Sequence, residues 1–279
     1  MAPLRSQVVL VTGCSTGIGR ALARELKVAG HRPFATARKL DAIADLASEG
    51  IETLRLDVND PRSIEAAVGS VARRAGRIDV LINNAGINFF GPAMEMKIEE
   101  VRAVFETNVV GLVAVTQSVF PHMVEQRAGR IVNLGSVVGL LPTPFAATYC
   151  ATKSAVHMLS EVLRMEAQPF GIEVVVVQPG GVQSSIADSS SREIERFQSP
   201  ASRYHPAFGG IRKRAYASQR GAMPTDAFAR ALVRKAFANP APRVVRLGAG
   251  ADTLPKLARM PGKVRDRILS RTYELDKLP

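Results

Sequence analysis

Short runs rich in valine, isoleucine and leucine alternate with helical patterns along most of this 279-residue chain. Continuous apolar runs of this length are typical of strands buried on both faces, and their alternation with helices favours a parallel sheet. The strand-like runs are QVVLVT at 7–12, HRPFATA at 31–37, IETLRLDV at 51–58, IDVLINNAG at 78–86, GRIVNLGS at 129–136, IEVVVVQPG at 172–180 and, as a candidate seventh, RVVRLG at 243–248. The predicted fold class is α/β: a doubly wound parallel sheet of about seven strands with helices on both faces, in a single domain over residues 1–279.

Helical patterns fill the intervals between these runs. We expect one from the glycine-rich turn after the first run to Gly30, and others at 41–48, 61–75, 97–122 and 147–168. Pro61 suits the first turn of its helix, and a proline and a glycine at 169 and 171 close the last pattern.

Two stretches depart from the alternation. Residues 183–223 are rich in serine, arginine, glycine and proline and show no clear period, so we predict a substrate lid there, with a solvated loop as the alternative. Residues 250–279 form a basic C-terminal extension with interspersed leucine, methionine, isoleucine and valine. This segment could lie on an anionic membrane surface or be a solvated helix packed on the body of the protein, and the sequence leaves both open.

Composition limits the class of protein and its compartment. With 46% hydrophobic and 22% charged residues, no run of 18 apolar residues and only a five-residue apolar stretch near the start, the sequence predicts a soluble, cytoplasmic protein. Cys14 and Cys150 are the only cysteines and lack partners at metal-ligand spacing, so neither a disulfide framework nor a metal site is predicted. The net charge of +12 favours anionic ligands such as nucleotides.

The sequence TGCSTGIG joins the first strand to the first helix and contains Gly13, Gly17 and Gly19. Glycine permits positive φ and lets backbone N–H groups approach an anion at the positive end of the helix dipole. A dinucleotide pyrophosphate fits such a turn, and a tight turn that binds nothing is the alternative.

The end of the second strand indicates which dinucleotide to expect. It reads Thr36-Ala37-Arg38-Lys39, with no carboxylate before Asp41 to accept hydrogen bonds from an adenosine ribose. A small residue followed by arginine suits a 2′-phosphate, which a guanidinium binds in bidentate fashion. We therefore expect NADP(H) to be preferred over NAD(H), unless Arg38 and Lys39 are only exposed loop charges.

The sequence YCATK places Tyr149 and Lys153 four residues apart in a segment with helical periodicity. Residues at this spacing share one face of a helix. A neighbouring ammonium favours phenolate, so the pair predicts a lowered pKa for Tyr149 and a phenol suited to carrying a proton. Taken alone, the pair also fits a solvated helix face.

Seven motifs follow one another along the chain: TGCSTGIG, LDV with Asp57, NNAG at 83–86, ETNVVG with Asn108, NLGSVVG with Ser136, YCATK, and PGGVQS at 179–184. In this order they resemble the short-chain dehydrogenase/reductase family, whose fold is Rossmann-like. The resemblance covers roughly residues 6–185 and, through the strand near 243, the whole predicted sheet. More narrowly, LRMEAQPFGIEVVVVQPGGVQSSIAD and RDRILSR resemble the branch of 1-acyldihydroxyacetone-phosphate reductase-like and 17β-hydroxysteroid dehydrogenase-like enzymes.

The resemblance implies an NADP(H)-dependent oxidoreductase that interconverts a ketone and a secondary alcohol. Tyr149 would act as general acid, while Lys153 lowers its pKa and holds the cofactor ribose. Ser136 would hydrogen-bond the substrate oxygen, and Asn108 would hold a water that continues the proton path to solvent. Taken alone, a serine at a strand end or an asparagine inside a helix is more often structural.

The resemblance also implies contacts for the cofactor and the substrate. The expected substrate residues are mostly apolar, which suits a lipid, steroid, retinoid or aryl ketone, and basic residues of the predicted lid could meet a phosphate headgroup. The cofactor set is Gly13, Ser15, Thr16, Gly17, Ile18, Gly19, Arg38, Asp57, Val58, Asn84, Ala85, Gly86, Tyr149, Lys153, Pro179, Gly180, Val182 and Ser184. The substrate set is Asn88, Phe89, Val138, Phe145 and Gly181, and the basic lid residues are Arg203, Arg212, Lys213 and Arg214.

A second class of function competes with the enzymatic one. The high positive charge also fits a nucleotide-sensing or nucleic-acid-binding protein that keeps the fold without turnover. The intact set of serine, tyrosine, lysine and asparagine argues against it, and no nucleic-acid partner is predicted. Peripheral membrane contact through the basic segment and homo-oligomerisation through the helices that carry Asn108 and Tyr149 remain open.

Overall fold

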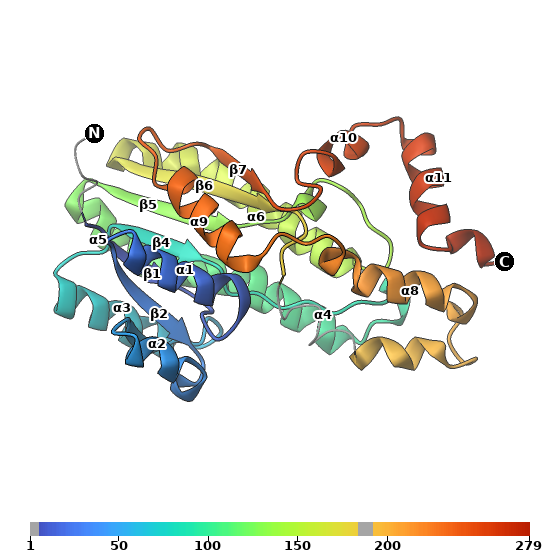
Figure 1. The fold of residues 1–279 in the computed structure, drawn as a ribbon, viewed down its shortest axis with the longest axis horizontal. Coiled ribbons are helices and arrows are strands. Elements are labelled where there is room, and N and C mark those ends of the chain that lie inside the picture. Colours follow the sequence, from blue (N-terminus) through green and yellow to red (C-terminus); the bar gives the residue numbers. More distant parts are fainter. Residues whose placement is uncertain (1–5, 184–191) are drawn as a thin grey trace.

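The computed structural model describes residues 6–183 and 192–279. Its seven strands form one sheet in the order β3-β2-β1-β4-β5-β6-β7, and every neighbouring pair is parallel (Figure 1). The predicted fold class is confirmed, and the candidate seventh strand is present. The strands are β1 Val8–Val11, β2 Arg32–Ala37, β3 Glu52–Arg55, β4 Val80–Asn83, β5 Gly129–Leu134, β6 Ile172–Pro179 and β7 Val244–Leu247.

Helices cover both faces of the sheet (Figure 1). The predicted helical intervals are all helical, although 41–48 begins as a 3-10 turn and 97–122 contains a π-helical segment. Asp60 caps the helix that starts at Pro61, because its carboxylate accepts a hydrogen bond from the Arg62 N–H at 3.0 Å. The helices around the sheet are α1 Gly17–Val28, α2 Ala44–Ser48, α3 Pro61–Ala75, α4 Ile98–Phe105, α5 Gly111–Gln126, α6 Ala147–Ala167 and α9 Thr225–Ala236.

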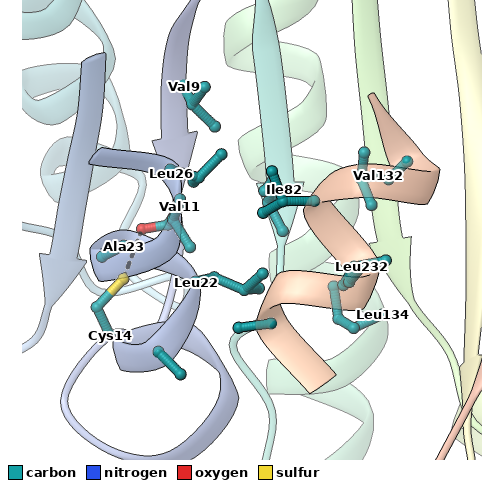
Figure 2. Close-up of a cluster of buried hydrophobic side chains, with 14 of the residues drawn as sticks. Val9, Val11, Cys14, Leu22, Ala23, Leu26, Ile82, Val132, Leu134 and Leu232 are labelled. Carbon is teal, nitrogen blue, oxygen red and sulfur yellow. Dashed lines mark hydrogen bonds between the residues drawn. The ribbon is translucent and has the colours of Figure 1, made fainter. Parts of the chain in front are cut away.

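Two hydrophobic cores lie on opposite faces of the sheet. Alternate residues of a strand point to opposite faces, so Val9 and Val11 of β1 join one core while Leu10 joins the other. Figure 2 shows the first core, where Leu22 of α1 and Leu232 of α9 pack over the sheet. The second core lies under α3, α5 and α6.

One continuous helical stretch, Ile98–Gln126, is long and apolar enough to cross a membrane. It comprises α4, the π-helical segment Glu106–Val110 and α5. Val115, Val119 and Met123 of this stretch are fully buried in the second core. Packing against the sheet therefore accounts for part of its apolar character.

The described residues of the predicted lid have a regular fold. Residues 192–219 contain 3-10 turns and helix α8 Phe208–Ala215, and Phe197 and Ile211 belong to a third hydrophobic cluster. The expectation of irregular structure is therefore wrong for this part. Helix α8 was not predicted because the two adjacent glycines in its sequence, FGGIRKRA, have low helix propensity. Gly210 is needed there because a Cβ at this position would lie 1.8 Å from the carbonyl oxygen of Tyr273.

The basic C-terminal segment forms two further helices, α10 Leu254–Ala258 and α11 Gly262–Thr272. Figure 1 shows both at the end of the molecule that carries α8. Tyr273, Leu275 and Leu278, which follow α11, pack against the third cluster, so the end of this segment is anchored on the body of the protein.

Candidate active site

The chain leaves neighbouring strands β1 and β4 in opposite directions, and such a switch point creates a crevice at the carboxyl ends of the strands. Two hollows lie along this edge. Ile18, Asn84 and Gly86 line both of them, so the two hollows form one continuous groove. We call the half beside the glycine turn the nucleotide half and the other the substrate half.

The glycine turn is held in place by close packing against the end of β4. Gly13 and Gly17 have positive φ values of 71° and 55°. The side-chain amide of Asn84 donates to the carbonyl oxygens of Thr12 at 2.8 Å and Gly13 at 3.0 Å. A Cβ on Gly19 would lie 2.3 Å from the Gly13 oxygen, so only glycine lets the helix start this close to the turn.

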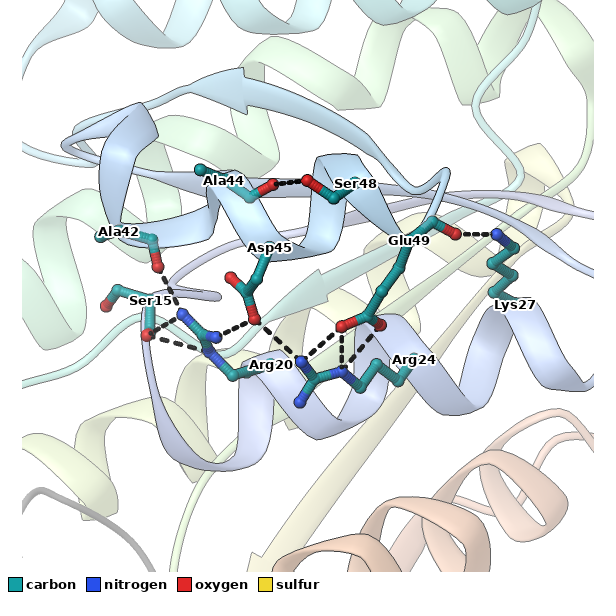
Figure 3. A network of polar contacts seen from close by, with 9 residues as sticks. All are labelled: Ser15, Arg20, Arg24, Lys27, Ala42, Ala44, Asp45, Ser48 and Glu49. Atoms are coloured by element: carbon teal, nitrogen blue, oxygen red, sulfur yellow. Dashed lines mark hydrogen bonds and ion pairs between the residues drawn. The ribbon is translucent and has the colours of Figure 1, made fainter.

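Arginine side chains of α1 fix the outer side of the same turn (Figure 3). The Arg20 guanidinium donates two hydrogen bonds to the carbonyl oxygen of Ser15, at 3.1 and 2.9 Å, and also contacts the carbonyl oxygen of Ala42 and the carboxylate of Asp45. Arg20 therefore ties the turn to the segment that follows β2, which brings the two sides of the nucleotide half together.

The nucleotide half contains most of the predicted cofactor residues. Arg38 is exposed at its rim, and among the described residues no carboxylate forms an ion pair with it. A glycine turn at the start of α1, packed too closely for a Cβ at Gly13 or Gly19, and an exposed guanidinium at the rim fit NADP(H). The predicted residues that line this half are Gly13, Ser15, Thr16, Gly17, Ile18, Arg38, Asp57, Val58, Asn84, Ala85 and Gly86, with Gly19 packed behind them.

The substrate half brings together Ser136, Tyr149 and Lys153. Ser136 follows β5, and the other two lie in the first two turns of α6 and face the same hollow, as their spacing predicts. Of the other predicted residues, Asn88, Val138, Pro179, Gly180, Gly181 and Val182 also line it.

The Ser136 hydroxyl donates to the carbonyl oxygen of Pro179 at 3.4 Å and lines the same hollow as the Tyr149 phenol. Burial raises the pKa of Tyr149 to about 12, and the positive charge of Arg214 opposes this rise. The predicted lowering of this pKa by Lys153 is therefore wrong, because loss of water around the phenol has the larger effect. A raised pKa keeps the phenol protonated at neutral pH, which suits a proton donor.

Lys153 is buried beneath the phenol. Its Nζ lies 5.5 Å from the centre of the Tyr149 ring and donates to the carbonyl oxygen of Leu134 at 2.7 Å. Burial lowers the pKa of Lys153 to about 8, so its ammonium exchanges a proton much more readily than a solvated lysine.

Asn108 is buried in the π-helical segment between α4 and α5. Its side-chain oxygen accepts from the Ile87 N–H at 2.8 Å, and its amide donates to the Ile87 oxygen at 2.9 Å and to Thr152 Oγ1 at 3.2 Å. Asn108 thus ties the segment after β4 to α6, next to Lys153. These hydrogen bonds agree with the alternative that an asparagine inside a helix has a structural role. The role of Asn108 in holding a water stays a prediction.

His157, to which no role was assigned from the sequence, supports the site. Its Nε2 accepts a hydrogen bond from the Ser136 N–H at 3.4 Å, and a Cβ on Gly135 would lie 2.3 Å from the same nitrogen. Burial lowers the pKa of His157 to about 4, which keeps the ring neutral and able to accept this bond. Its position four residues after Lys153, on one helix face with Tyr149, was the available signal.

Two predicted substrate residues do not line the hollow. Phe145 has a positive φ of 63° and packs edge-to-face against Tyr204 in the third cluster. Gly86, Asn88 and Phe90 line the hollow, whereas Phe89 between the last two does not. Ser184 lies outside the described residues.

The sequence named Arg214 but missed the rest of the far wall of the substrate half. Leu141 and several residues in and just after α10 and α11 complete this wall, so the C-terminal segment belongs to the site. Their apolar residues recur at helical spacing, which is the signal that could have identified them. They are Leu254, Leu257, Ile268, Leu269 and Tyr273.

Comparisons with known proteins agree with this geometry. The chain is 39% identical over 180 residues to the NADPH-dependent 1-acyldihydroxyacetone phosphate reductase of Schizosaccharomyces pombe. The matched region covers 64% of this chain but only 60% of that protein. It is 30% identical over 289 residues to the protein of the same name from Saccharomyces cerevisiae, covering 100% and 96% of the two chains.

Solved structures and a family model point the same way. A short-chain dehydrogenase from Streptomyces avermitilis has a TM-score of 0.77 at 30% identity, covering 98% of both chains. The family model described as short chain dehydrogenase matches residues 7–195. The resemblance predicted from the motifs is therefore confirmed: this chain belongs to the short-chain dehydrogenase family.

Proposed function

We propose that this protein is an NADP(H)-dependent oxidoreductase that interconverts a ketone and a secondary alcohol on a hydrophobic substrate. The observation that carries the proposal is that Ser136, Tyr149 and Lys153 line one largely apolar hollow, which is continuous with the glycine turn. Two relatives are named as NADPH-dependent reductases of a lipid ketone, which supports the cofactor and the substrate class.

In the proposed reduction, the chain supplies a proton and a polar anchor for the carbonyl oxygen. NADPH, when bound, supplies the hydride. The Ser136 hydroxyl donates a hydrogen bond to the carbonyl oxygen, and Tyr149 transfers its phenolic proton to that oxygen as negative charge develops there. Lys153, buried under the phenol with a pKa near 8, holds the proton that restores the phenol.

A ketone panel tests the proposal. We expect NADPH-dependent reduction of at least one lipid, steroid, retinoid or aryl ketone, measured as loss of NADPH absorbance. Steeply salt-dependent binding of DNA or RNA with no redox activity would instead favour the nucleic-acid-binding alternative. The described residues favour the oxidoreductase over the nucleic-acid-binding alternative, because they include both the proposed proton donor and the nucleotide half of the groove.

Substitution of Arg38 tests the choice of cofactor. In Arg38→Gln we expect the KM for NADPH to rise about tenfold while the KM for NADH stays unchanged, because an exposed guanidinium contributes one or two charge-assisted hydrogen bonds to a 2′-phosphate. Steady-state kinetics with both nucleotides measures this. Lys39→Gln is the matched control, since Lys39 is also exposed but does not line the groove. Equal changes with NADPH and NADH would contradict the assignment.

We also propose that the C-terminal segment contacts an anionic membrane surface. Met260, Val264 and Ile268 recur every four residues and are 38%, 43% and 40% exposed. Six basic residues and one acidic residue lie between Leu254 and Thr272. Ile268 also lines the substrate half, so the exposed apolar face adjoins the wall of the site.

Vesicle binding tests this contact. We expect the protein to co-sediment with vesicles that contain phosphatidylserine, less so as salt rises, and Val264→Glu to reduce the bound fraction severalfold. Met94→Glu is the control, because Met94 is 83% exposed on a different part of the molecule. Equal binding of Val264→Glu and the wild type would exclude this surface.

A further inference from the structure

Arg214 is a buried cation in the wall of the substrate half. It lies on α8, is 5% exposed, and shares the hollow with the apolar side chains of Phe90, Leu141 and Leu257. Its charge reaches the reacting groups, because it opposes the rise in the pKa of Tyr149 that burial causes. A buried cation thus lies in the largely apolar hollow that also contains the proposed proton donor.

The Arg214 guanidinium has no anionic partner among the described residues. Its Nε is buried and donates no hydrogen bond. The guanidinium carbon of Arg214 lies over the face of the Phe90 ring, 5.0 Å from the ring centre. A cation–π contact contributes about 0.5–2 kcal/mol, whereas a buried charge without a counter-ion is costly. The desolvation of Arg214 is therefore only partly offset.

Other arginines with low exposure in this chain are paired. Arg130 forms an ion pair with Glu173 at 2.5 Å, and Arg196 forms one with Glu100 at 2.5 Å. Both guanidinium groups therefore have the carboxylate that a buried cation requires. Arg214 is the exception, and it lines the substrate half; Arg220 also lines this half but is exposed.

The neighbouring basic residues do not share its position. Arg212 is exposed, and Arg212 and Lys213 line a separate surface hollow that also contains Glu274. Arg203 is exposed, and its N–H donates to Glu95 at 2.9 Å. Of the four basic residues that the sequence singled out, only Arg214 lines the substrate half.

We propose that Arg214 pairs with an anionic group, a carboxylate or a phosphate, carried by the hydrophobic substrate. This inference rests on the proposed function and narrows its substrate class to acidic lipid-like or aryl ketones. Arginine suits this role because its planar fork binds either anion through two parallel hydrogen bonds. The anion would share the hollow with the carbonyl group, because Arg214, Tyr149 and Ser136 all line it.

Calorimetry tests the inference without turnover. With NADPH present, we expect octanoate or octyl phosphate to bind at least tenfold more tightly than octanol, and Arg214→Gln to remove this preference. The two anions also distinguish a carboxylate site from a phosphate site. Arg212→Gln on the same helix is the control and should keep the preference. Arg214→Lys keeps the charge but loses the fork, and it should recover part of the preference even if Arg214→Gln folds poorly.

Kinetics on matched substrates completes the test. We expect the wild type to reduce a long-chain keto acid at least tenfold more efficiently than its methyl ester, and Arg214→Gln to lose mainly the keto acid activity. If Arg214→Gln lowers both activities equally, or if the wild type binds octanol as tightly as the two anions, the inference is overturned while ketone reduction stands. If no ketone is reduced, the proposed function fails, and the calorimetry still decides whether Arg214 binds an anion.

Discussion

The substitution Tyr149→Phe is expected to lower kcat/KM for ketone reduction about 1,000-fold, within the range of 100- to 10,000-fold typical of general acid catalysis. The change removes a single oxygen from a ring that packs against Lys153 and lines the substrate half. The fold and the affinity for NADPH should therefore stay close to those of the wild type. Stopped-flow and steady-state rates, together with NADPH binding, measure these quantities.

The pH dependence gives this prediction a second signature. A general acid must hold its proton, so its contribution is complete below its pKa and is lost above it. Burial raises the pKa of Tyr149 to about 12, so the phenol itself should not limit reduction through neutral pH. Burial lowers the pKa of Lys153 to about 8, so a fall in kcat/KM near pH 8 would report the loss of the lysine proton.

Tyr204→Phe is the matched control for this experiment. Tyr204 packs against Phe145 in the third cluster and does not line the substrate half. Its loss of a hydroxyl should leave kcat/KM within about twofold of the wild type. Turnover of Tyr149→Phe at the wild-type rate would show that the proton comes from another group and would remove the basis of the proposed mechanism.

The sheet and the reacting groups were predictable from sequence because their signals are local. Strands such as β6 are continuous apolar runs. Tyr149 and Lys153 are four residues apart in a helix, which places them on one helix face. The glycine turn carries its own backbone requirement in Gly13 and Gly17. None of these features depends on a distant part of the chain.

The far wall of the site was not predictable in the same way, because it forms between distant segments. Helix α8 has a weak intrinsic pattern and is stabilised where Gly210 meets Tyr273, more than sixty residues later. The burial of Arg214 depends on that packing. The pKa of Tyr149 likewise depends on how completely the folded chain excludes water, which the spacing of two residues does not indicate.

The substitution Gly19→Ala is expected to weaken NADPH binding at a position where helix propensity alone predicts a benefit. Gly19 lies in the first turn of α1 with φ outside the left-handed region, so alanine suits the backbone. Its Cβ would nevertheless lie 2.3 Å from the Gly13 oxygen and 2.4 Å from the Asn84 amide nitrogen. The start of α1 must therefore shift away from both.

Two losses should follow from this shift. Overpacking of this kind costs about 1–3 kcal/mol of unfolding free energy, which urea titration measures. Two charge-assisted hydrogen bonds from the turn to the pyrophosphate, at about 1.5 kcal/mol each, correspond to NADPH affinity about 100-fold weaker. Calorimetric titration with NADPH measures this second loss.

Gly69→Ala separates the effect of crowding from the general effect of replacing a helical glycine. Gly69 lies within α3, and a Cβ there would meet only the flexible end of the Arg73 side chain, at 3.2 Å. That substitution should raise the unfolding free energy by about 0.5–1 kcal/mol and leave NADPH binding unchanged. If Gly19→Ala gave the same result, the close approach of α1 to the turn could not be what forms the anion site, and the nucleotide would have to be held elsewhere in the groove.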